Sequence, residues 1–394
     1  MGSRELLMIP GPVEYEPEVM GALGAKTGSH VGPRFIATFG RALKGLRQLF
    51  LAPTAQPFVL AGSGTLAMEL AVANLVEPED AVLVVNTGYF GDRMVSILER
   101  HGALVEQVRA PVGAAPSLGE IARAFDGRHF KLVAVTHVDT STGVLAPVEP
   151  IARMACERGT LSLVDAVCSA AGEELRQEDW GVDVAVTASQ KAMGVPPGLA
   201  IASVGARALA AYRARRHPVR TFTCDWGQWL PVFQAYERGE AAYFATPPVN
   251  LVNALERSLA SILEEGVEPR VARHDRMALA LRAGWRSLQL ELVPRTDDVT
   301  AHTMSALYYP AGADASLLAR IRDEGVIVAG GLHPEIKPRY FRVGHMGSVS
   351  ANDVLATVGA VGRALRRMGA RVDVGAAVGA AEQAIVESEI GSDQ

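Results

Sequence analysis

The sequence predicts an α/β fold: a mainly parallel sheet lies between helices, and a smaller C-terminal α+β domain follows. Two observations support this class. Short apolar runs rich in β-branched residues recur up to Val204, and segments with helical periodicity separate most of them. Strands that are apolar on both faces and alternate with helices are typical of a parallel sheet covered on both sides. Beyond Gly266 this alternation of apolar runs and helical segments changes to a long helical run, which predicts a second domain.

Length and composition fit this picture. The chain has 394 residues, of which 49% are hydrophobic, so it can bury a sizeable core in more than one domain. A formal net charge of −5 argues against nucleic acid as a partner. No basic segment followed by an apolar run opens the chain, and no apolar stretch of roughly eighteen residues occurs, so we expect no membrane partner. The three cysteines have neither metal-ligand spacing nor the even count of a disulfide framework, which suits a reducing compartment. We therefore expect a cytoplasmic protein without a bound metal.

Residues 1–34 are predicted to form an N-terminal arm, because glycine and proline punctuate residues 8–34 and favour irregular backbone. A large domain is predicted over residues 35–265, and it begins with an amphipathic helix over Phe35–Phe50. Further helices are expected over Thr65–Leu75, Arg93–His101 and Ile151–Glu157. The apolar runs predict strands at Pro57–Ala61, Ala81–Val85, Leu132–Val135, Leu161–Val164, Val184–Val186 and Leu199–Val204.

The small domain is predicted over residues 266–371. A long helix reaching Arg286 opens it, and further helices are expected over Ala315–Asp323 and Ser350–Arg367. Strands are expected at Met304–Tyr309 and Val326–Ala329. An alanine-rich tail over residues 372–394 is predicted to form a helix with a frayed acidic end.

Ligands of such sheets bind at the carboxyl ends of the strands. The first strand end carries Gly62-Ser63-Gly64-Thr65-Leu66-Ala67, which matches the dinucleotide pattern G-x-G-x-x-G/A. The second strand, however, ends on Asn86 and Thr87 instead of the acid that holds a ribose. A single phosphate bound by backbone N–H groups of Gly64 and Thr65 is therefore the favoured interpretation, and a plain tight turn is the alternative.

The next two strand ends carry rings and hydroxyls. Phe90 lies in a glycine-flanked turn, where it either stacks on a flat ligand or belongs to the core. Thr140 follows the strand that ends at Val135, and its hydroxyl either binds a ligand oxygen or caps a turn. His137 has no accompanying cluster of metal ligands, so we expect a buried histidine with its hydrogen bonds satisfied.

Asp165 and Lys191 follow two further strands. A buried carboxylate needs a partner, and Asp165 has no basic neighbour in sequence, so it either meets a protonated ring nitrogen of a ligand or caps a helix. Lys191 precedes Pro196-Pro197-Gly198 and is either a solvated loop residue or a nucleophilic amine. Together, a phosphate cradle, a stacking ring, hydroxyls, a carboxylate and an amine at one sheet edge predict pyridoxal phosphate.

Several stretches carry a specific resemblance over nearly the whole chain: Gly11-Pro12, Ala61-Gly62-Ser63-Gly64-Thr65, Ser141-Thr142-Gly143-Val144, Val164-Asp165-Ala166-Val167, Ser189-Gln190-Lys191 and Phe341-Arg342-Val343-Gly344. The sequence resembles the class V aminotransferases of the fold-type I pyridoxal-phosphate enzymes, in particular the serine–pyruvate and alanine–glyoxylate group. The resemblance implies a seven-stranded sheet. It also implies a homodimer with shared active sites.

The resemblance assigns a role to each candidate residue. Lys191 would form the Schiff base with the cofactor, and Asp165 would pair with its ring nitrogen. Arg342 would clamp the carboxylate of the substrate. The other implied cofactor-binding residues are Ser63, Gly64, Thr65, Phe90, Thr140 and Gln190, with Tyr243 and Thr246 from the neighbouring subunit; Gly28 and Ser29 would line the substrate pocket.

The implied reaction moves an amino group from alanine or serine to glyoxylate or pyruvate in two half-reactions. Ureidoglycine–glyoxylate and pyridoxamine–pyruvate transfer remain alternatives on the same scaffold. A cysteine desulfurase is disfavoured, because no cysteine lies near Arg342 and Phe90 stands where such enzymes stack a histidine. A cofactor-binding protein without catalysis is disfavoured by the intact Lys191, Asp165 and Arg342. His333 and His345 receive no role from the sequence.

Overall fold

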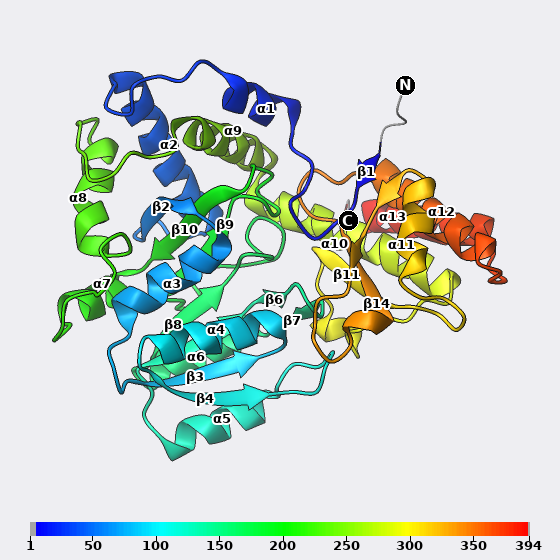
Figure 1. Cartoon of the computed structure of the whole chain (residues 1–394), viewed down its shortest axis with the longest axis horizontal. Helices are drawn as coiled ribbons and strands as arrows, with labels where there is room; N and C mark the ends of the chain where they lie inside the picture. Colours follow the sequence, from blue (N-terminus) through cyan, green and yellow to red (C-terminus); the bar gives the residue numbers. More distant parts are fainter. Residues whose placement is uncertain (1–4, 393–394) are drawn as a thin grey trace.

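A seven-stranded sheet forms the centre of the large domain, with the strand order β2-β10-β9-β8-β5-β3-β4. The computed structural model describes residues 5–392 (Figure 1). Only β10 runs in the opposite direction to the other six strands. The strands are β2 (Gln56–Gly62), β3 (Ala81–Asn86), β4 (Leu104–Arg109), β5 (Leu132–Thr136), β8 (Leu161–Asp165), β9 (Val184–Ala188) and β10 (Gly198–Val204).

The six strands predicted from apolar runs are confirmed, as is the mainly parallel sheet. The seventh strand, β4, was not predicted as an apolar run, because it lies at the edge of the sheet and four of its six residues are exposed. Its sequence, Leu-Val-Glu-Gln-Val-Arg, is therefore partly polar. An edge strand needs no continuous apolar sequence, since only part of it packs on a neighbour.

Helices cover both faces of this sheet. α3 (Gly64–Leu75) and α4 (Tyr89–Arg100) pack against each other, and so do α5 (Leu118–Gly127) and α6 (Val148–Glu157). Right-handed crossovers place the first pair on one face and the second pair on the other, because the chain reverses its direction across the sheet after β4. α2 (Pro33–Leu49), α8 (Trp226–Glu237) and α9 (Val249–Glu265) pack beyond β2, and α7 (Ala206–Arg213) follows β10 (Figure 1).

The N-terminal segment contains more regular structure than predicted. The expected irregular backbone is wrong for α1 (Pro17–Gly24), which begins with a proline in its first turn and packs against α9. Proline is favoured at that position, because its missing N–H is not needed there. Before α1, β1 (Leu6–Leu7) pairs with β12 (Val326–Ile327), so the described start of the chain joins the small domain.

The small domain is α+β, as predicted. Its sheet has the order β11-β14-β13, formed by β11 (Met304–Tyr308), β14 (Tyr340–Gly344) and β13 (Ala329–Gly330). A separate hydrophobic core around Trp285, Leu317 and Phe341 joins this sheet to its helices. These helices are α10 (Val267–Ser287), α11 (Ser316–Asp323), α12 (Ala351–Arg367) and α13 (Val374–Ser392). The tail helix is confirmed by α13, and the last residues of its expected acidic end, 393–394, lie outside the described residues.

Over residues 5–392, no helix is both long enough and apolar enough to span a bilayer.

Candidate active site

A cavity of about 310 Å³ lies at the carboxyl edge of the large sheet. Loops that follow β2, β3, β5, β8 and β9 converge on it, because the carboxyl ends of parallel strands share one edge. The chain before α1 closes the cavity with Gly11 and Pro12. The polar or chemically distinctive lining residues are Ser63, Gly64, Thr65, Phe90, Arg93, Thr140, Asp165, Cys168, Gln190 and Lys191.

Lys191 lies in this cavity and not in solvent, with 9% of its surface exposed. Ser189 fixes the turn that carries it: its Oγ donates to the Pro196 carbonyl at 2.7 Å and accepts from the Leu199 N–H at 3.2 Å. The Lys191 Nζ donates a hydrogen bond to the carbonyl of Pro10. Burial lowers the pKa of Lys191, which favours the neutral amine that a nucleophile requires.

Asp165 is the last residue of β8, and it is 2% exposed. Its Oδ1 accepts a hydrogen bond from the Val167 N–H at 3.0 Å, and among the described residues it forms no ion pair. Burial, together with the nearby charge of Asp139, raises the pKa of Asp165 to about 6. A buried carboxylate without a cationic partner is an unsatisfied site for a proton donor or a cation.

The start of α3 has the geometry expected of an anion cradle. The helix begins at Gly64, and Ser63 caps it by accepting a long hydrogen bond of 3.5 Å from the Leu66 N–H. A Cβ atom on Gly64 would stand 2.9 Å from Cγ2 of Val167, so only glycine fits between the two loops. The N–H groups of Gly64 and Thr65, which Ser63 does not cap, are therefore free to face an anion.

Arg93 also lines this cavity, and the sequence reasoning did not identify it. Its Nη1 donates to the Thr65 Oγ1 at 2.8 Å, and its guanidinium carbon lies 4.8 Å from the centre of the Phe90 ring. Arg93 follows Phe90 by three residues on α4, a spacing that places both side chains on one face of a helix. That spacing is the signal that would have revealed it.

Asp139 holds the turn that presents Phe90. Its Oδ2 accepts from the Phe90 N–H at 3.0 Å and from the Gly91 N–H at 3.4 Å. Its Oδ1 accepts from the Ser141 N–H at 2.9 Å and from the Ser141 hydroxyl at 2.5 Å. A fully buried carboxylate that accepts four hydrogen bonds orients the start of α4 relative to the β5 loop.

Arg342 reaches toward the cavity from β14 without lining it. Its Nη1 donates to the Thr140 carbonyl at 3.1 Å and its Nε donates to the Gly330 carbonyl at 2.9 Å. Thr140 itself is buried and lines the cavity. The guanidinium therefore lies at the junction of the two domains, and its charge contributes to the lowered pKa of Lys191.

Besides Arg342, four of the predicted site residues lie outside this cavity. Gly28, Ser29, Tyr243 and Thr246 are all exposed, and the Tyr243 and Thr246 hydroxyls lie 3.5 Å from each other. The ring of Tyr243, which is 62% exposed, lies 5.4 Å from that of His30. Gln190 does line the cavity, and its Oε1 is buried without a hydrogen-bond partner.

The histidines differ from the expectation in one respect. His137 is buried, as expected, but its Nδ1 has no hydrogen-bond partner, so the expected satisfied histidine is wrong. The β5 loop turns through the β6 (Val138–Asp139) and β7 (Val144–Leu145) hairpin and positions the backbone of His137, while the ring of His137 lacks a hydrogen bond at Nδ1. His345 Nε2 lies 3.1 Å from the Ser305 hydroxyl. Residues 5–392 contain no group of three or more His, Cys, Asp or Glu arranged to hold a metal ion.

Known proteins are similar to this chain in sequence. Residues 16–350 match the family model described as aminotransferase class-V. Alanine–glyoxylate aminotransferase 1 of Saccharomyces cerevisiae is 39% identical over 363 residues, which span 89% of this chain and 94% of the yeast protein. L-aspartate–glyoxylate aminotransferase of Paracoccus denitrificans is 33% identical, over 97% of this chain and 96% of that protein.

A solved structure agrees with these relatives. The pyridoxamine–pyruvate aminotransferase of Mesorhizobium loti superposes with a TM-score of 0.92 at 27% identity, over 98% of each chain. The fold, the extent of the family match and the sequence identity over almost the full length all indicate the same family. The chain belongs to the class V aminotransferase family.

Proposed function

We propose that this protein is a pyridoxal-phosphate-dependent aminotransferase that moves an amino group from alanine or serine to glyoxylate or pyruvate. One observation carries the proposal: the buried amine of Lys191 and the buried, unpaired carboxylate of Asp165 line one cavity at the carboxyl edge of the sheet. Each group costs free energy to bury alone, so the pair is best explained by a ligand that uses both.

The residues of the cavity fit this cofactor. Its phosphate would bind at the start of α3, where Gly64 and Thr65 offer N–H groups and the unpartnered Gln190 Oε1 marks an amide that is free to reorient. Its ring would lie on Phe90, which Asp139 holds in place. Its ring nitrogen would donate to Asp165, and a proton donor there would lower the raised pKa of that carboxyl.

Chemistry at this site depends on the protonation of Lys191. When bound, pyridoxal phosphate supplies an electron-withdrawing ring that acidifies the Cα proton of an attached amino acid. Lys191 Nζ would hold the resting cofactor covalently and, once displaced, would accept and return that proton. Burial lowers the pKa of Lys191, which raises the fraction of neutral amine available for both tasks.

Arg342 would bind the carboxylate of the substrate. Its Nη1 and Nε already donate to the carbonyls of Thr140 and Gly330, which orients the planar guanidinium and leaves Nη2 without a partner among the described residues. A pre-oriented guanidinium loses little side-chain entropy when a carboxylate arrives. The substrate would then lie between the two domains, with its Cα near Lys191.

The two named relatives support glyoxylate as the amino acceptor, because glyoxylate appears in the names of both enzymes. They differ in the donor, alanine in one and aspartate in the other. Transfer from pyridoxamine to pyruvate is supported by the fold match to the Mesorhizobium loti enzyme. Small changes in a pocket alter such preferences, so the donor must be measured.

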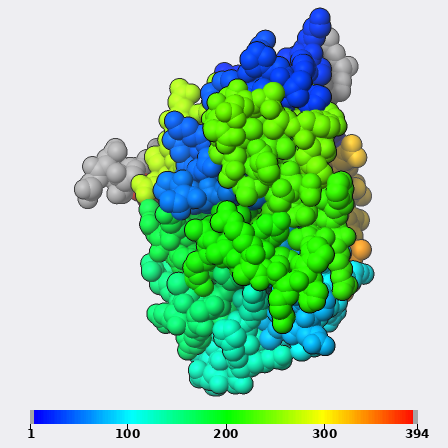
Figure 2. All heavy atoms as spheres, turned by 90° about the vertical axis from the view of Figure 1, so that its left-hand side faces the viewer, coloured from blue at the N-terminus to red at the C-terminus, as the bar shows by residue number. Residues whose placement is uncertain are grey.

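A homodimer with shared sites accounts for the residues left outside the cavity. Tyr243 and Thr246 are exposed hydroxyl side chains, and the neighbouring Phe222 is 73% exposed. Figure 2 shows that residues around 205–250, in green, cover much of one face below the dark-blue N-terminal segment. A partner chain on this face would bury these aromatic rings and bring Tyr243 and Thr246 to its phosphate site, with Gly28 and Ser29 near its substrate pocket.

We also place the enzyme in the cytoplasm, since its three cysteines are unpaired, as a reducing compartment would keep them.

A half-reaction screen tests the proposed reaction. The purified protein is loaded with pyridoxal phosphate and mixed separately with alanine, serine, aspartate and pyridoxamine, while its absorption spectrum is recorded. We expect alanine or serine to convert the cofactor to its aminated form, and glyoxylate or pyruvate to restore the starting spectrum. A protein that stays colourless after addition of the cofactor would refute the proposal.

A further inference from the structure

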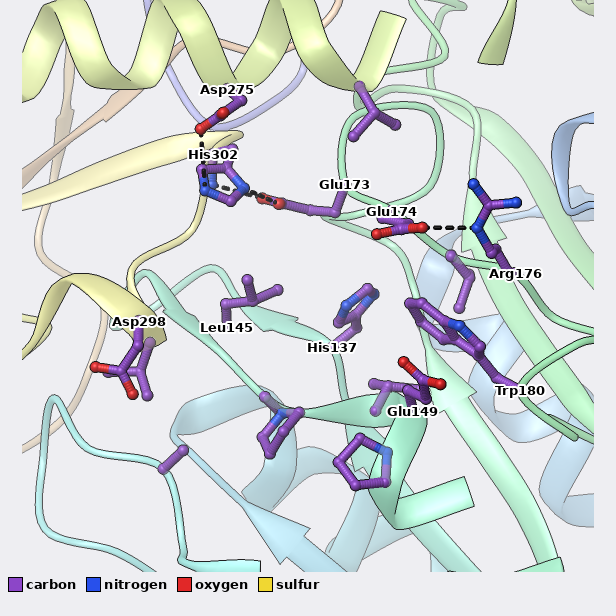
Figure 3. Close-up of a pocket in the computed structure, with 18 of the residues that line it drawn as sticks. His137, Leu145, Glu149, Glu173, Glu174, Arg176, Trp180, Asp275, Asp298 and His302 are labelled. Carbon is purple, nitrogen blue, oxygen red and sulfur yellow. Dashed lines mark hydrogen bonds and ion pairs between the residues drawn. The ribbon is translucent and has the colours of Figure 1, made fainter. Parts of the chain in front are cut away.

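A second cavity, of about 1240 Å³, lies between the two domains (Figure 3). It shares no lining residue with the active-site cavity. Glu149 and Trp180 line it from the large domain, and Asp275, Asp298 and His302 line it from the small domain. The proposed transamination uses none of these residues.

The wall of this cavity is largely apolar and partly aromatic. The indole of Trp180 meets the ring of His137 edge to face, with centroids 6.4 Å apart and planes at 82°. Leu145 lies beside them on the same wall (Figure 3). An arrangement of flat rings and aliphatic carbons favours a ligand with a flat apolar body.

Acidic side chains outnumber basic ones around the cavity. Six carboxylates line it, against two guanidiniums, and the carboxylates are Glu149, Glu173, Glu174, Glu268, Asp275 and Asp298. Arg176 is neutralised by Glu174 at 2.6 Å and Glu268 at 2.5 Å. Arg295 directs its Nε to the carbonyl of Val112 at 3.1 Å. The lining therefore carries an excess of negative charge that favours a cation.

Two of these acids already pair with a histidine of the protein. The His302 ring lies 2.7 Å from Glu173 and 3.4 Å from Asp275 (Figure 3). Burial disfavours its charged form, but the hydrogen bond to Glu173 and the two negative charges outweigh burial and raise the pKa of His302. Asp298 has no ion pair or side-chain hydrogen bond with the described residues. Glu149 binds the exposed Arg153 through Oε1 alone, which leaves its Oε2 without a partner among the described residues. Asp298 and Glu149 are thus the acids available to a ligand.

The ring of His137 is a second, independent sign of a ligand. It is 4% exposed, it projects into the cavity between Leu145 and Trp180 (Figure 3), and its Nδ1 has no partner. Burial lowers the pKa of His137 to about 4, so the ring is neutral near pH 7. A neutral imidazole offers one donor and one acceptor, and an unpaired buried nitrogen is costly unless something binds it.

We propose that this interdomain cavity is a binding site for a small organic cation with a flat apolar body. Its ring packs against Trp180 and His137 and its ammonium group faces Glu149, which lies beside Trp180, while Asp298 adds negative charge from the opposite side of the cavity (Figure 3). The indole face adds a cation–π attraction for the same ligand. Because both domains contribute to the site, such a ligand would also hold them in one relative position.

The probe must not react in the active site. N,N-Dimethyl-2-phenylethylamine carries a proton near pH 7 and, as a tertiary amine, cannot form an imine with pyridoxal phosphate. 2-Phenylethanol and 3-phenylpropanoate share its ring but are neutral and anionic. Calorimetric titration of the full chain, with and without added cofactor, is expected to show one saturable site for the cation in both cases and weaker or no binding of the other two.

Variants locate the site. Glu149→Gln combined with Asp298→Asn is expected to weaken binding of the cation about five-fold and to leave 2-phenylethanol unchanged. Asp126→Asn is the control, because it removes an exposed carboxylate that does not line the cavity. Ala272→Trp, which fills the cavity from α10, is expected to abolish binding of every probe while the visible spectrum of the cofactor stays the same.

Equal affinity for the cationic and anionic probes would overturn the proposal. So would unchanged binding in the Ala272→Trp variant, or displacement of the cation by an active-site ligand. Absence of the cofactor spectrum alone would bear on the transaminase proposal and not on this site, because the titration without cofactor is independent of it.

Discussion

The α-carbon of Gly11 lies against the side chain of Lys191, although 180 residues separate the two in sequence. A Cβ atom on Gly11 would stand 2.5 Å from Cδ of Lys191, and Gly11 has a φ of +87°. The adjacent Pro10 carbonyl accepts the hydrogen bond of the Lys191 amine. The N-terminal segment therefore sets the position of the nucleophile.

Gly11→Ala tests this contact. We expect about a hundred-fold loss of kcat, because a displaced Lys191 would miss its reacting atom. The positive φ would also cost about 1–2 kcal/mol of stability. Gly312→Ala is the matched control, since Gly312 has a φ of +83° but no atom near its Cβ position. Steady-state kinetics and denaturation should show similar destabilisation in both variants and lost activity only in the first; equal kcat values would argue against the contact.

Lys191→Ala removes the proposed nucleophile. We expect the fold to persist and kcat to fall by about 10⁴-fold, since the variant loses both the covalent anchor and the proton carrier. The visible band of the bound cofactor should shift, and borohydride should no longer fix the cofactor to the chain. Lys337→Ala removes an exposed lysine away from the cavity and should behave as wild type. Near-normal turnover in Lys191→Ala would reject the assignment.

Asp165→Asn removes the carboxylate that would face the ring nitrogen. We expect kcat to fall by about 10²–10³-fold, because an amide cannot stabilise a protonated ring as a charge does. Asp183→Asn is the control: Asp183 is also a buried carboxylate, but it accepts from the Ser162 N–H at 2.9 Å and lies away from the cavity. That variant should lose stability and keep its kcat. Similar kcat losses in both would indicate a purely structural role.

The raised pKa of Asp165 also predicts a pH dependence of the protein without cofactor. A carboxyl with a folded-state pKa of about 6 binds its proton more tightly than in the unfolded chain, so its contribution to stability is present at low pH and lost as pH rises through 6. Relative to Asp165→Asn, the wild type should lose roughly 1 kcal/mol of unfolding free energy between pH 5 and pH 7. Urea denaturation at the two pH values measures this difference; a constant difference would contradict the assigned pKa.

Hybrid dimers test the shared active site. A chain with Lys191→Ala and a chain with Tyr243→Phe and Thr246→Ala should each be impaired alone, the second by about ten-fold weaker cofactor binding. Mixed dimers would contain one site with an intact Lys191 and intact partner hydroxyls, so activity should rise on mixing. Differently tagged chains, purified as hybrids, allow the measurement. If hybrid dimers form but mixing restores no activity, the hydroxyls of Tyr243 and Thr246 either bind the cofactor of their own chain or do not bind it at all.

Several features were accessible from the sequence because they depend on neighbours along the chain. Asp165 ends the buried run Leu161–Asp165, Lys191 follows the run Val184–Ala188, and Gly64 follows the run Gln56–Gly62. In a parallel sheet the strand ends meet at one edge, so local pattern and strand direction together placed these residues in one site. Strand β4 was not predicted, because its exposed position at the edge of the sheet requires no apolar pattern in its sequence.

Contacts between distant segments required the tertiary structure. No spacing indicates that Gly11 meets Lys191, that Arg93 binds Thr65, or that Asp139 holds Phe90. The same holds for the interdomain cavity, where His137, Trp180 and Asp298 come from three separate stretches. Periodicity reports which face of an element is buried, whereas the packing of elements decides what that face meets, and packing depends on the shapes of all the surrounding side chains at once.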